Sequence, residues 1–432
     1  MSNKIELTSE TKYQLLLEIS HKVRDTLDLD VILNHLLDTV KNVVDYDAAG
    51  IFVLNTALVH PRTERPTNLI AGIARRGFDP NPTGRDAMLT FGRGVVGHVI
   101  LTRECVVIPD VSRDARYVVG RQATRSEVAV PIIRGEQTIG ALNLESDLLA
   151  AFDQSDVEVL RFFADAASIS IEKAMLHRQL IDKKQVEEQL QIAQDIQHRL
   201  LPRHSPEMPG YDIAAICLPT YEIGGDYYDY IDLADGRLGL VVADVSGEGV
   251  PAALVMTAFR ALIRTQARSR LSPSRIARQV NRILPEFTGR ANFVTAVYGT
   301  LDPQTGKFHY TNCGHNPPLL VRSTGEMELL PYTGPLLGVF PEADYTTGEI
   351  TLAPGDGLVV YTDGIVEATN PEGQIFGAQR LSQLPALRQA MPAMKLIESI
   401  IRACQAFTRL ESFQDDVAIV VVRRKMETSQ ST

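Results

Sequence analysis

The chain has 432 residues, of which 44% are hydrophobic and 22% are charged, and its formal net charge is −10. This length predicts two or three domains, the composition is typical of a soluble globular protein, and the negative charge argues against a nucleic-acid partner. The longest apolar runs are too short to span a membrane, and the N-terminus has no apolar signal core. Four cysteines without CxxC spacing predict reduced thiols, so we expect a cytoplasmic protein that has no membrane partner.

The first third of the chain mixes helical and strand patterns. Apolar residues recur at three- and four-residue steps between residue 9 and about residue 45, which predicts helix. A second helix is expected after the GRGVVG sequence at 92–97. Strands are expected at 48–54, 105–108, 126–133 and 139–144. The last two strands flank Arg134-Gly135-Glu136, whose composition is typical of a hairpin turn.

A long helix is predicted from Asp153 to Leu201, because this stretch contains no Pro and no Gly and Pro202 follows it. Its apolar positions form an imperfect seam that includes Val186 and Leu190. One interpretation is a solvated helix that only connects two domains. We favour a parallel coiled coil in a homodimer formed through the N-terminal and linker helices, because so long a helix needs a partner to bury its seam.

Short β runs with turns dominate the chain after Pro202. These runs lie at 213–218, 238–242, 294–300, 307–311, 319–322, 358–361 and 417–422. Helical patterns interrupt them at 251–269, 273–284 and about 394–410. Strands grouped around helices, without strict alternation, predict an α+β sandwich.

Acidic residues stand at the ends of several of these β runs. They are Asp226 and Asp229 in GGDYYD, Asp244 in VVADVSGEG, Asp363 in LVVYTDG, and Asp415 and Asp416 in FQDDVAIVVV. Asp244 alone could be a helix cap and Asp363 alone a simple turn residue. The adjacent Asp415 and Asp416 are harder to explain in this way, because they repel each other unless a cation or a basic partner is near. Together, carboxylates from several strand ends would repel one another unless cations lie between them, and Mg²⁺ or Mn²⁺ prefers such oxygen ligands. The pattern therefore predicts a metal-dependent hydrolase.

The motifs also carry a family resemblance over about residues 187–425. The order GGDYYD, DVSGEGVPAAL, NCGHNPP, GPLLGV, GDGLVVYTDGIVEA and FQDDVAIVVV resembles the SpoIIE/RsbU-type branch of the PPM serine/threonine protein phosphatases. The resemblance implies an αββα sandwich that holds two Mn²⁺ or Mg²⁺ ions. It implies that Asp226, Asp244 and the backbone carbonyl of Val245 bind one ion, and that Asp244, Asp363 and Asp415 bind the other. These four aspartates are the expected catalytic residues.

Further residues are expected around the ligands, and the implied reaction is attack on a phosphoserine by water activated between the two ions. Glu222, Asp229, Asp416 and Glu248 are expected to contact the site directly or through water. Glu248 stands where many bacterial relatives have His, and the acid that protonates the leaving group is unassigned. His315 in NCGHNPP is expected to be structural.

A second resemblance covers about residues 28–173. The sequences VILNHLLDTVKNVVDYDAAGIFVLN, FGRGVVGHVILTRECVVIPDVSRD and SEVAVPIIRGEQTIGALNLESDLLAAFDQSDVEVLRFFADAASISI are similar to those of GAF sensory domains. The resemblance implies an antiparallel sheet with helices on one face and an unknown small ligand on the other. Leu144 replaces the Lys of an Asn-Lys pattern found in cyclic-nucleotide GAF domains, which argues against that ligand. Cys105 is expected to be structural.

These interpretations predict a sensor-regulated phosphatase. The expected parts are an N-terminal helix (1–27), a GAF domain (28–173), a coiled-coil linker (174–201), a phosphatase domain (202–425) and a disordered tail (426–432). The implied substrate is a phosphorylated STAS-domain protein, an anti-sigma-factor antagonist supplied by another chain. One alternative is a non-catalytic adaptor that binds phosphoproteins or a small ligand, and another is a small-molecule receptor whose output lies in a different chain.

Overall fold

The computed structural model describes residues 17, 26–54, 70–78, 94–269, 271–289 and 292–426. The predicted N-terminal helix (1–27) and C-terminal tail (426–432) therefore lie almost entirely outside the described residues. Contacts divide the chain into two compact units, 1–186 and 187–432. Within the described ranges, we find no helix with the length and apolarity that a membrane span requires.

The first unit is built around one antiparallel sheet. Its strands are β1 (Ala48–Leu54), β2 (Ile70–Arg76), β3 (Val106–Ile108), β4 (Ser126–Arg134) and β5 (Gln137–Ser146), in the order β2-β1-β5-β4-β3. Its helices are α2 (Leu29–Val40), α3 (Gly94–Thr102), the 3-10 turn η2 (Val111–Arg113) and the beginning of α4 (Gln154–Leu200). The predicted hairpin at residues 134–136 is confirmed, and Gly135 takes the positive φ of 57° that its turn requires.

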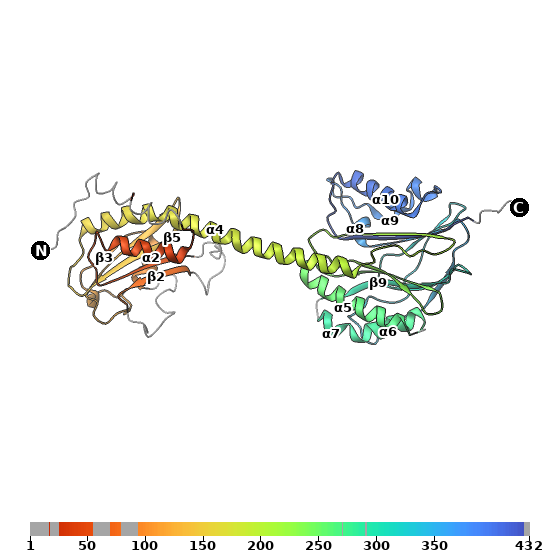
Figure 1. Cartoon of the computed structure of the whole chain (residues 1–432), viewed down its shortest axis with the longest axis horizontal. Coiled ribbons are helices and arrows are strands. Elements are labelled where there is room, and N and C mark those ends of the chain that lie inside the picture. Colours follow the sequence, from red (N-terminus) through yellow and green to blue (C-terminus); the bar gives the residue numbers. More distant parts are fainter. Residues whose placement is uncertain are drawn as a thin grey trace. The chain divides into compact units, whose positions relative to one another are not determined.

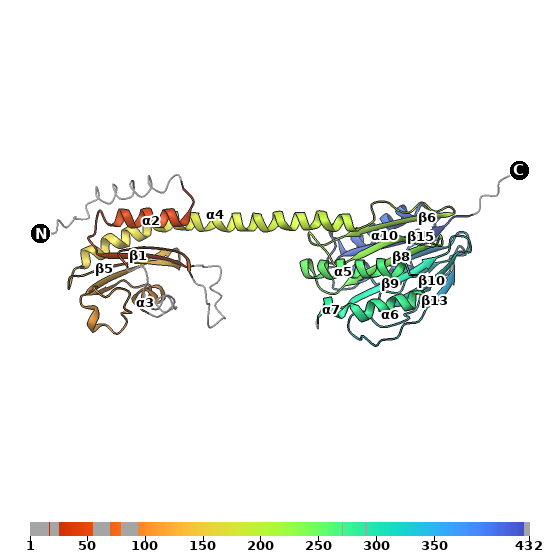
Figure 2. The same ribbon diagram turned by 60° about the horizontal axis from the view of Figure 1, so that its bottom comes forward.

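Helices cover both faces of this sheet (Figures 1 and 2). On one face, α2 and the first turns of α4 pack on alternate strand residues such as Leu142 and Leu144. On the other face, α3 packs on a smaller core that contains Phe52 and Ala141. Successive side chains of a strand point to opposite faces of the sheet, so one strand contributes residues to both cores.

The second unit contains two five-stranded sheets. One has the order β13-β10-β9-β8-β7 and the other has the order β12-β11-β14-β15-β6. The strands are β6 (Tyr211–Leu218), β7 (Tyr227–Asp232), β8 (Leu238–Val245), β9 (Val294–Leu301), β10 (Lys307–Cys313), β11 (Leu319–Val321), β12 (Met327–Leu329), β13 (Gly348–Thr351), β14 (Gly357–Tyr361) and β15 (Val417–Arg424). The helices are α5 (Gly249–Ala267), α6 (Pro273–Ile283), α7 (Pro285–Thr288), α8 (Asp363–Val366), α9 (Gly377–Ser382), the 3-10 turn η3 (Pro385–Arg388) and α10 (Ala393–Thr408).

These elements form four layers, with α5 to α7 on one outer face and α8 to α10 on the other (Figure 1). The two sheets bury a shared core between them, to which Val242 and Val420 belong. Separate cores join each sheet to its own helices, through Phe259 of α5 on one side and Ile397 of α10 on the other. The expected αββα sandwich is therefore confirmed.

Helix α4 is continuous, as predicted, but only its beginning is buried. Its last buried residue is Met175. Beyond it, Leu180, Val186, Ile192 and Ile196 expose more than half of their surface in the single chain. Such a stripe is what a partner helix would cover. The coiled coil and the homodimer stay predictions.

Candidate metal centre

A pocket of about 370 Å³ lies at the strand ends of the second unit. Residues at the ends of β8, β9 and β10 line it from one sheet, and residues next to β14 and β15 line it from the other. Its acidic lining residues are Asp244, Glu248, Asp363, Glu367 and Asp415, and no Lys or Arg is among its lining residues. Three of the four predicted catalytic aspartates are thus brought together around one acidic pocket.

The fourth predicted aspartate, Asp226, lies just before β7 and is only 3% exposed. The Thr362 hydroxyl donates a hydrogen bond of 2.7 Å to its Oδ2. The same hydroxyl oxygen accepts a hydrogen bond of 2.7 Å from the backbone N–H of Ala418 in β15. Thr362 therefore fixes Asp226, which enters from one sheet, to the edge of the other sheet.

The neighbours Asp415 and Asp416 have different surroundings. Asp416 accepts hydrogen bonds of 2.8 Å from the backbone N–H groups of Thr220 and Gly225, one on each oxygen. It thereby shapes the loop that delivers Asp226, whereas Asp415 lines the pocket. A Cβ on Gly224 would lie 2.2 Å from Asp416 Oδ2, so only glycine permits this close approach.

Burial and neighbouring negative charges raise the pKa values of the aspartates in and beside the pocket. Burial, reinforced by the charges of Asp363 and Asp415, raises the pKa of Asp244. Burial and the charge of Asp415 raise the pKa of Asp363 to about 6. Burial likewise raises the pKa of Asp226 far above its usual range, and the charge of Asp244 adds to this effect. These carboxylates therefore resist ionisation together unless a positive charge joins them.

The donor set of the pocket fits hard divalent cations, because its lining residues include five carboxylates and no Cys, and the imidazole of His315 is engaged at Nδ1 with the Thr295 hydroxyl. The carbonyl oxygen of Val245 lies close to Gly225, the residue before Asp226, because a Cβ on Gly225 would lie 2.7 Å from this oxygen. In the part of the chain that the structure describes, no three His, Cys, Asp or Glu side chains already converge closely enough to hold one ion.

The other predicted residues divide into two groups. Glu248 lines the pocket at the start of α5. Asp229 is fully buried away from the lining and forms an ion pair of 2.7 Å with Arg264 of α5, so it joins β7 to that helix. Glu222 is exposed and is not among the lining residues. The structure thus brings only Glu248 of these three into the pocket.

His315 also lines the pocket, although it is buried and its Nδ1 lies 2.8 Å from the Thr295 hydroxyl. Burial lowers the pKa of His315 to about 4, so the ring is neutral near pH 7. The backbone N–H of His315 donates a hydrogen bond of 2.8 Å to Asn312 Oδ1. The structural role of His315 stays a prediction, because its buried Nε2 has no hydrogen-bond partner among the described residues.

Three residues of the site were not singled out from the sequence. Glu367 adds a further carboxylate to the pocket, four residues after Asp363 in the same DGIVEA segment. Asn316 lines the pocket with a buried side-chain Nδ2 that has no hydrogen-bond partner among the described residues. Thr362 directly precedes Asp363. Its position next to a predicted metal ligand was the signal in the sequence that could have identified it.

Comparisons with known proteins agree with both units. Residues 234–425 match the family model of Stage II sporulation protein E (SpoIIE), and residues 26–172 match that of the GAF domain. The chain is 30% identical over 222 residues to Protein IcfG of Synechocystis sp., covering 45% of this chain and 35% of that protein. It is 26% identical over 247 residues to the phosphoserine phosphatase RsbU of Bacillus subtilis, covering 56% of this chain and 72% of that protein.

The solved SiaA-PP2C domain of Pseudomonas aeruginosa has the same fold as the second unit. The two are 23% identical with a TM-score of 0.50, and the match covers 56% of this chain and 98% of that domain. The chain spans about a third of the length of IcfG, so the comparison describes domains and not whole proteins. Residues 234–425 are therefore similar to the SpoIIE family and residues 26–172 to the GAF domain, and the four-layered fold of the second unit agrees with the first match.

Proposed function

We propose that the chain is a metal-dependent phosphatase that removes phosphate from phosphoserine on a partner protein. The observation that carries the proposal is the acidic pocket in which Asp244, Asp363 and Asp415 meet from separate strand ends of two sheets. The phosphoserine phosphatase RsbU of Bacillus subtilis is a relative over 247 residues, which supports phosphoserine as the substrate group. The family resemblance suggests a STAS-domain anti-sigma-factor antagonist as the partner.

Each residue has a task in this proposal. Asp226, Asp244 and the Val245 carbonyl would hold one Mn²⁺ or Mg²⁺, and Asp244, Asp363 and Asp415 would hold a second. When bound, such a pair of cations supplies an activated water and offsets the charge on the phosphoryl oxygens. The free Nδ2 of Asn316 would donate to a phosphoryl oxygen, since a buried amide without a partner gains a hydrogen bond there.

Contacts of the linker helix supply a route for regulation. Gln197 Nε2 donates to the carbonyl oxygen of Gly224 (2.6 Å), and the Gly224 N–H donates to Gln197 Oε1 (3.2 Å). Arg260 of α5 donates to the carbonyl oxygen of Leu200 (2.7 Å). The end of α4 therefore holds both the loop before Asp226 and the helix that follows the Asp244 loop, so a movement of α4 would alter the site.

The direct test is hydrolysis of phosphorylated STAS-domain proteins and of a phosphoserine peptide, with Mn²⁺ and with a chelator. We expect metal-dependent release of phosphate that Asp244→Asn abolishes, because this side chain is assigned to both ions. Asp344→Asn is the matched control, since Asp344 is 89% exposed and pairs only at the surface. Substantial metal-dependent turnover by Asp244→Asn would refute the assignment, and a wild-type chain that binds the phosphoprotein without turnover would favour an adaptor.

Regulation is tested by comparing the full chain with residues 187–432. We expect the two to differ in turnover, because the truncation removes the GAF domain and frees the beginning of the linker helix. Equal turnover at equal metal saturation would leave the linker as a spacer.

A further inference from the structure

Arginine is concentrated in one helical segment of the second unit. Residues 260–290 contain eight arginines, no lysine and one acidic residue, Glu286. The chain as a whole has the opposite balance, with a formal net charge of −10. The segment comprises the end of α5 together with α6 and α7, and these helices form one outer layer of the sandwich (Figures 1 and 2). Positive charge is therefore gathered on one outer face of this unit.

Three of these arginines form a stripe along α6. Arg275, Arg278 and Arg282 are exposed, and positions i, i+3 and i+7 share one face of a helix. The opposite face carries buried residues such as Ile276. Arg278 pairs with Asp344 at 3.2 Å on the protein surface. The other two arginines of the stripe form no ion pair with any residue that the structure describes.

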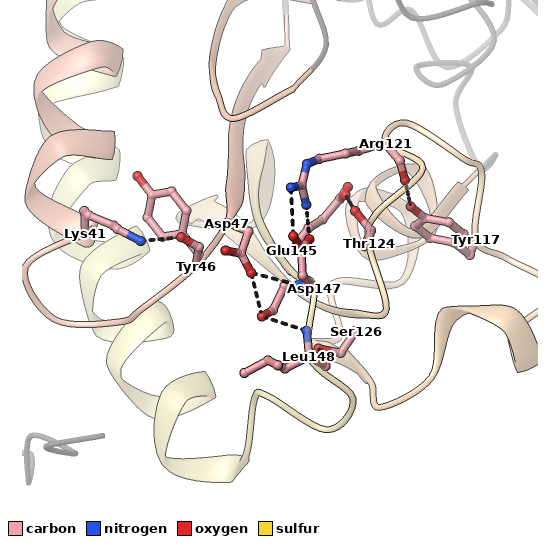
Figure 3. A network of polar contacts seen from close by, with 11 residues as sticks. Lys41, Tyr46, Asp47, Tyr117, Arg121, Thr124, Ser126, Glu145, Asp147 and Leu148 are labelled. Atoms are coloured by element: carbon pink, nitrogen blue, oxygen red, sulfur yellow. Dashed lines mark hydrogen bonds and ion pairs between the residues drawn. The ribbon is translucent and has the colours of Figure 1, made fainter. Parts of the chain in front are cut away.

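Arginines elsewhere in the chain have their charge offset within the fold. Figure 3 shows Arg121 of the first unit beside Asp147, to which its guanidinium donates two hydrogen bonds. Arg264 of α5 pairs with the buried carboxylate of Asp229. The two unpaired arginines of α6 have no such carboxylate among the described residues, so their charge is available to a partner.

The stripe weakens the helix that carries it. Arg275 lies in the first turn of α6, where the helix dipole disfavours positive charge. Arg278 is three residues from Arg275 and four from Arg282, and like charges at these spacings repel each other along a helix. Only Arg282, in the last turn, is placed favourably for the dipole. A binding surface explains this arrangement, because an anionic partner would remove the repulsion.

Exposed aromatic side chains border the stripe. The loop after Leu337 is fastened to α6, because Asn281 Nδ2 donates to the carbonyl oxygen of Phe340 (2.7 Å) and Asn281 Oδ1 accepts from the N–H of Gly338 (2.9 Å). The Phe340 side chain is nevertheless 59% exposed, and Phe287 of α7 is 50% exposed. Aromatic residues and arginine are enriched at protein–protein interfaces. We call the following residues the α6 surface: Arg275, Arg278, Arg282, Phe287 and Phe340.

The α6 surface adjoins the metal pocket. Leu337, three residues before Phe340, exchanges two backbone hydrogen bonds (3.0 and 2.8 Å) with Val294 at the start of β9. Phe293, the residue before Val294, lines the pocket, and its N–H donates to the Ser246 hydroxyl at 2.8 Å. The pocket therefore lies within reach of a protein held on the α6 surface.

The surroundings of the pocket give such a partner little other attraction. The charged residues that line the pocket are five acids, with no Lys or Arg among them. The chain, with its net charge of −10, also repels anionic partners at long range. A stripe of arginines beside the pocket offsets this repulsion locally and orients the partner, as complementary charges do at other interfaces.

We propose that the α6 surface binds an acidic face of the phosphoprotein substrate and holds it beside the metal pocket. This inference rests on the proposed phosphatase function and adds the place where the partner protein is recognised. A protein fits better than a nucleic acid or a membrane, because aromatic side chains stand beside the arginines and the net charge of the chain opposes a polyanion. Arginine suits carboxylates, since its planar guanidinium can donate two parallel hydrogen bonds.

The first test compares phosphate release from phosphorylated STAS-domain proteins and from a phosphoserine peptide, with the full chain and Mn²⁺. The charge-reversed variant Arg275→Glu/Arg282→Glu should lose at least tenfold in kcat/KM for the phosphoprotein, mainly through KM, and should hydrolyse the peptide like the wild type. The matched control is Arg388→Glu/Arg402→Glu, which makes the same change of net charge at two exposed residues of η3 and α10 on the other outer face. This control should match the wild type on both substrates.

The second test measures binding without any turnover. The same STAS-domain proteins, in their unphosphorylated form, are titrated into the full chain by calorimetry, because the α6 surface recognises the protein and not the phosphate. The charge-reversed variant should bind at least tenfold more weakly than the wild type and the control, and Phe340→Ala should bind severalfold more weakly. Raising the salt concentration should weaken binding to the wild type more than binding to the charge-reversed variant.

The proposal is overturned if the charge-reversed variant and the control bind equally well, or if no STAS-domain protein binds the wild type. An equal loss of peptide and phosphoprotein turnover would also overturn it, because it would place the damage in the pocket. Phosphatidylserine vesicles or duplex DNA that bind the wild type and not the charge-reversed variant would replace the phosphoprotein as the partner. The calorimetry does not involve phosphate release, so its outcome is separate from that of the proposed phosphatase activity.

Discussion

The Thr362 hydroxyl offers a sharp test of how the metal centre is built. It is fully buried, donates to Asp226 Oδ2 and accepts from the Ala418 N–H, each at 2.7 Å. Thr362→Val keeps the shape of the side chain and removes both hydrogen bonds. A lost bond to a charged group costs about 1.5–3 kcal/mol and a buried unpaired N–H about 1–3 kcal/mol, so we expect a loss of about 3 kcal/mol in the free energy of unfolding.

The assay is urea unfolding of the full chain with Mn²⁺, followed by far-UV circular dichroism, with hydrogen exchange in β15 to identify the transition of the second unit. Thr362→Ser is the control, because it keeps the hydroxyl and loses one methyl group, at a cost of about 1 kcal/mol. Thr362→Val should also weaken Mn²⁺ binding, since Asp226 loses the group that orients it. Equal unfolding midpoints and equal Mn²⁺ affinities for the Val and Ser variants would refute this reasoning.

Three more outcomes are expected. Gly224→Ala should lower turnover by more than about tenfold, because its Cβ would lie 2.2 Å from Asp416 Oδ2 and displace the loop; unchanged turnover would contradict this. The pKa of Asp363 is raised to about 6, so without metal its contribution to stability is present near pH 4 and is lost as the pH rises through 6. The unfolding temperature of the metal-free wild type should therefore fall between pH 4 and about pH 8, and that of Asp363→Asn should fall less. An equal decrease of the unfolding temperature in both proteins would contradict this. Gln197→Ala should change turnover and Gln191→Ala should not, since only Gln197 contacts Gly224.

The regular elements were largely predictable because their patterns are local. The run at 417–422 is wholly buried in β15 of the second unit, and a continuous apolar run is the expected signature of such a strand. Strand β7 was missed, because its sequence YYDYID places polar groups in a strand of which Asp229 is buried in an ion pair with Arg264. Strands β12 and β13 are short and mostly exposed, so they lack an apolar signal.

The acids of the site were predictable from their positions, and the family resemblance gave Asp415 and Asp416 different tasks, but the contacts that separate the two were not predictable. The contact of Thr362 with Asp226 joins residues 136 positions apart, and that of Asp416 with Thr220 joins residues 196 apart. No local pattern records such pairs. The different surroundings of Asp415 and Asp416 depend on which carboxylate meets the backbone of the loop before Asp226, and only the packing of the two sheets determines this.

Asp226 is hard to ionise while no cation is bound, because burial and the charge of Asp244 raise its pKa. A cation that binds between these two carboxylates would therefore also stabilise the second unit by mass action. Mn²⁺ should accordingly protect β8 and β15 from hydrogen exchange, and equal exchange of these strands with and without Mn²⁺ would contradict this.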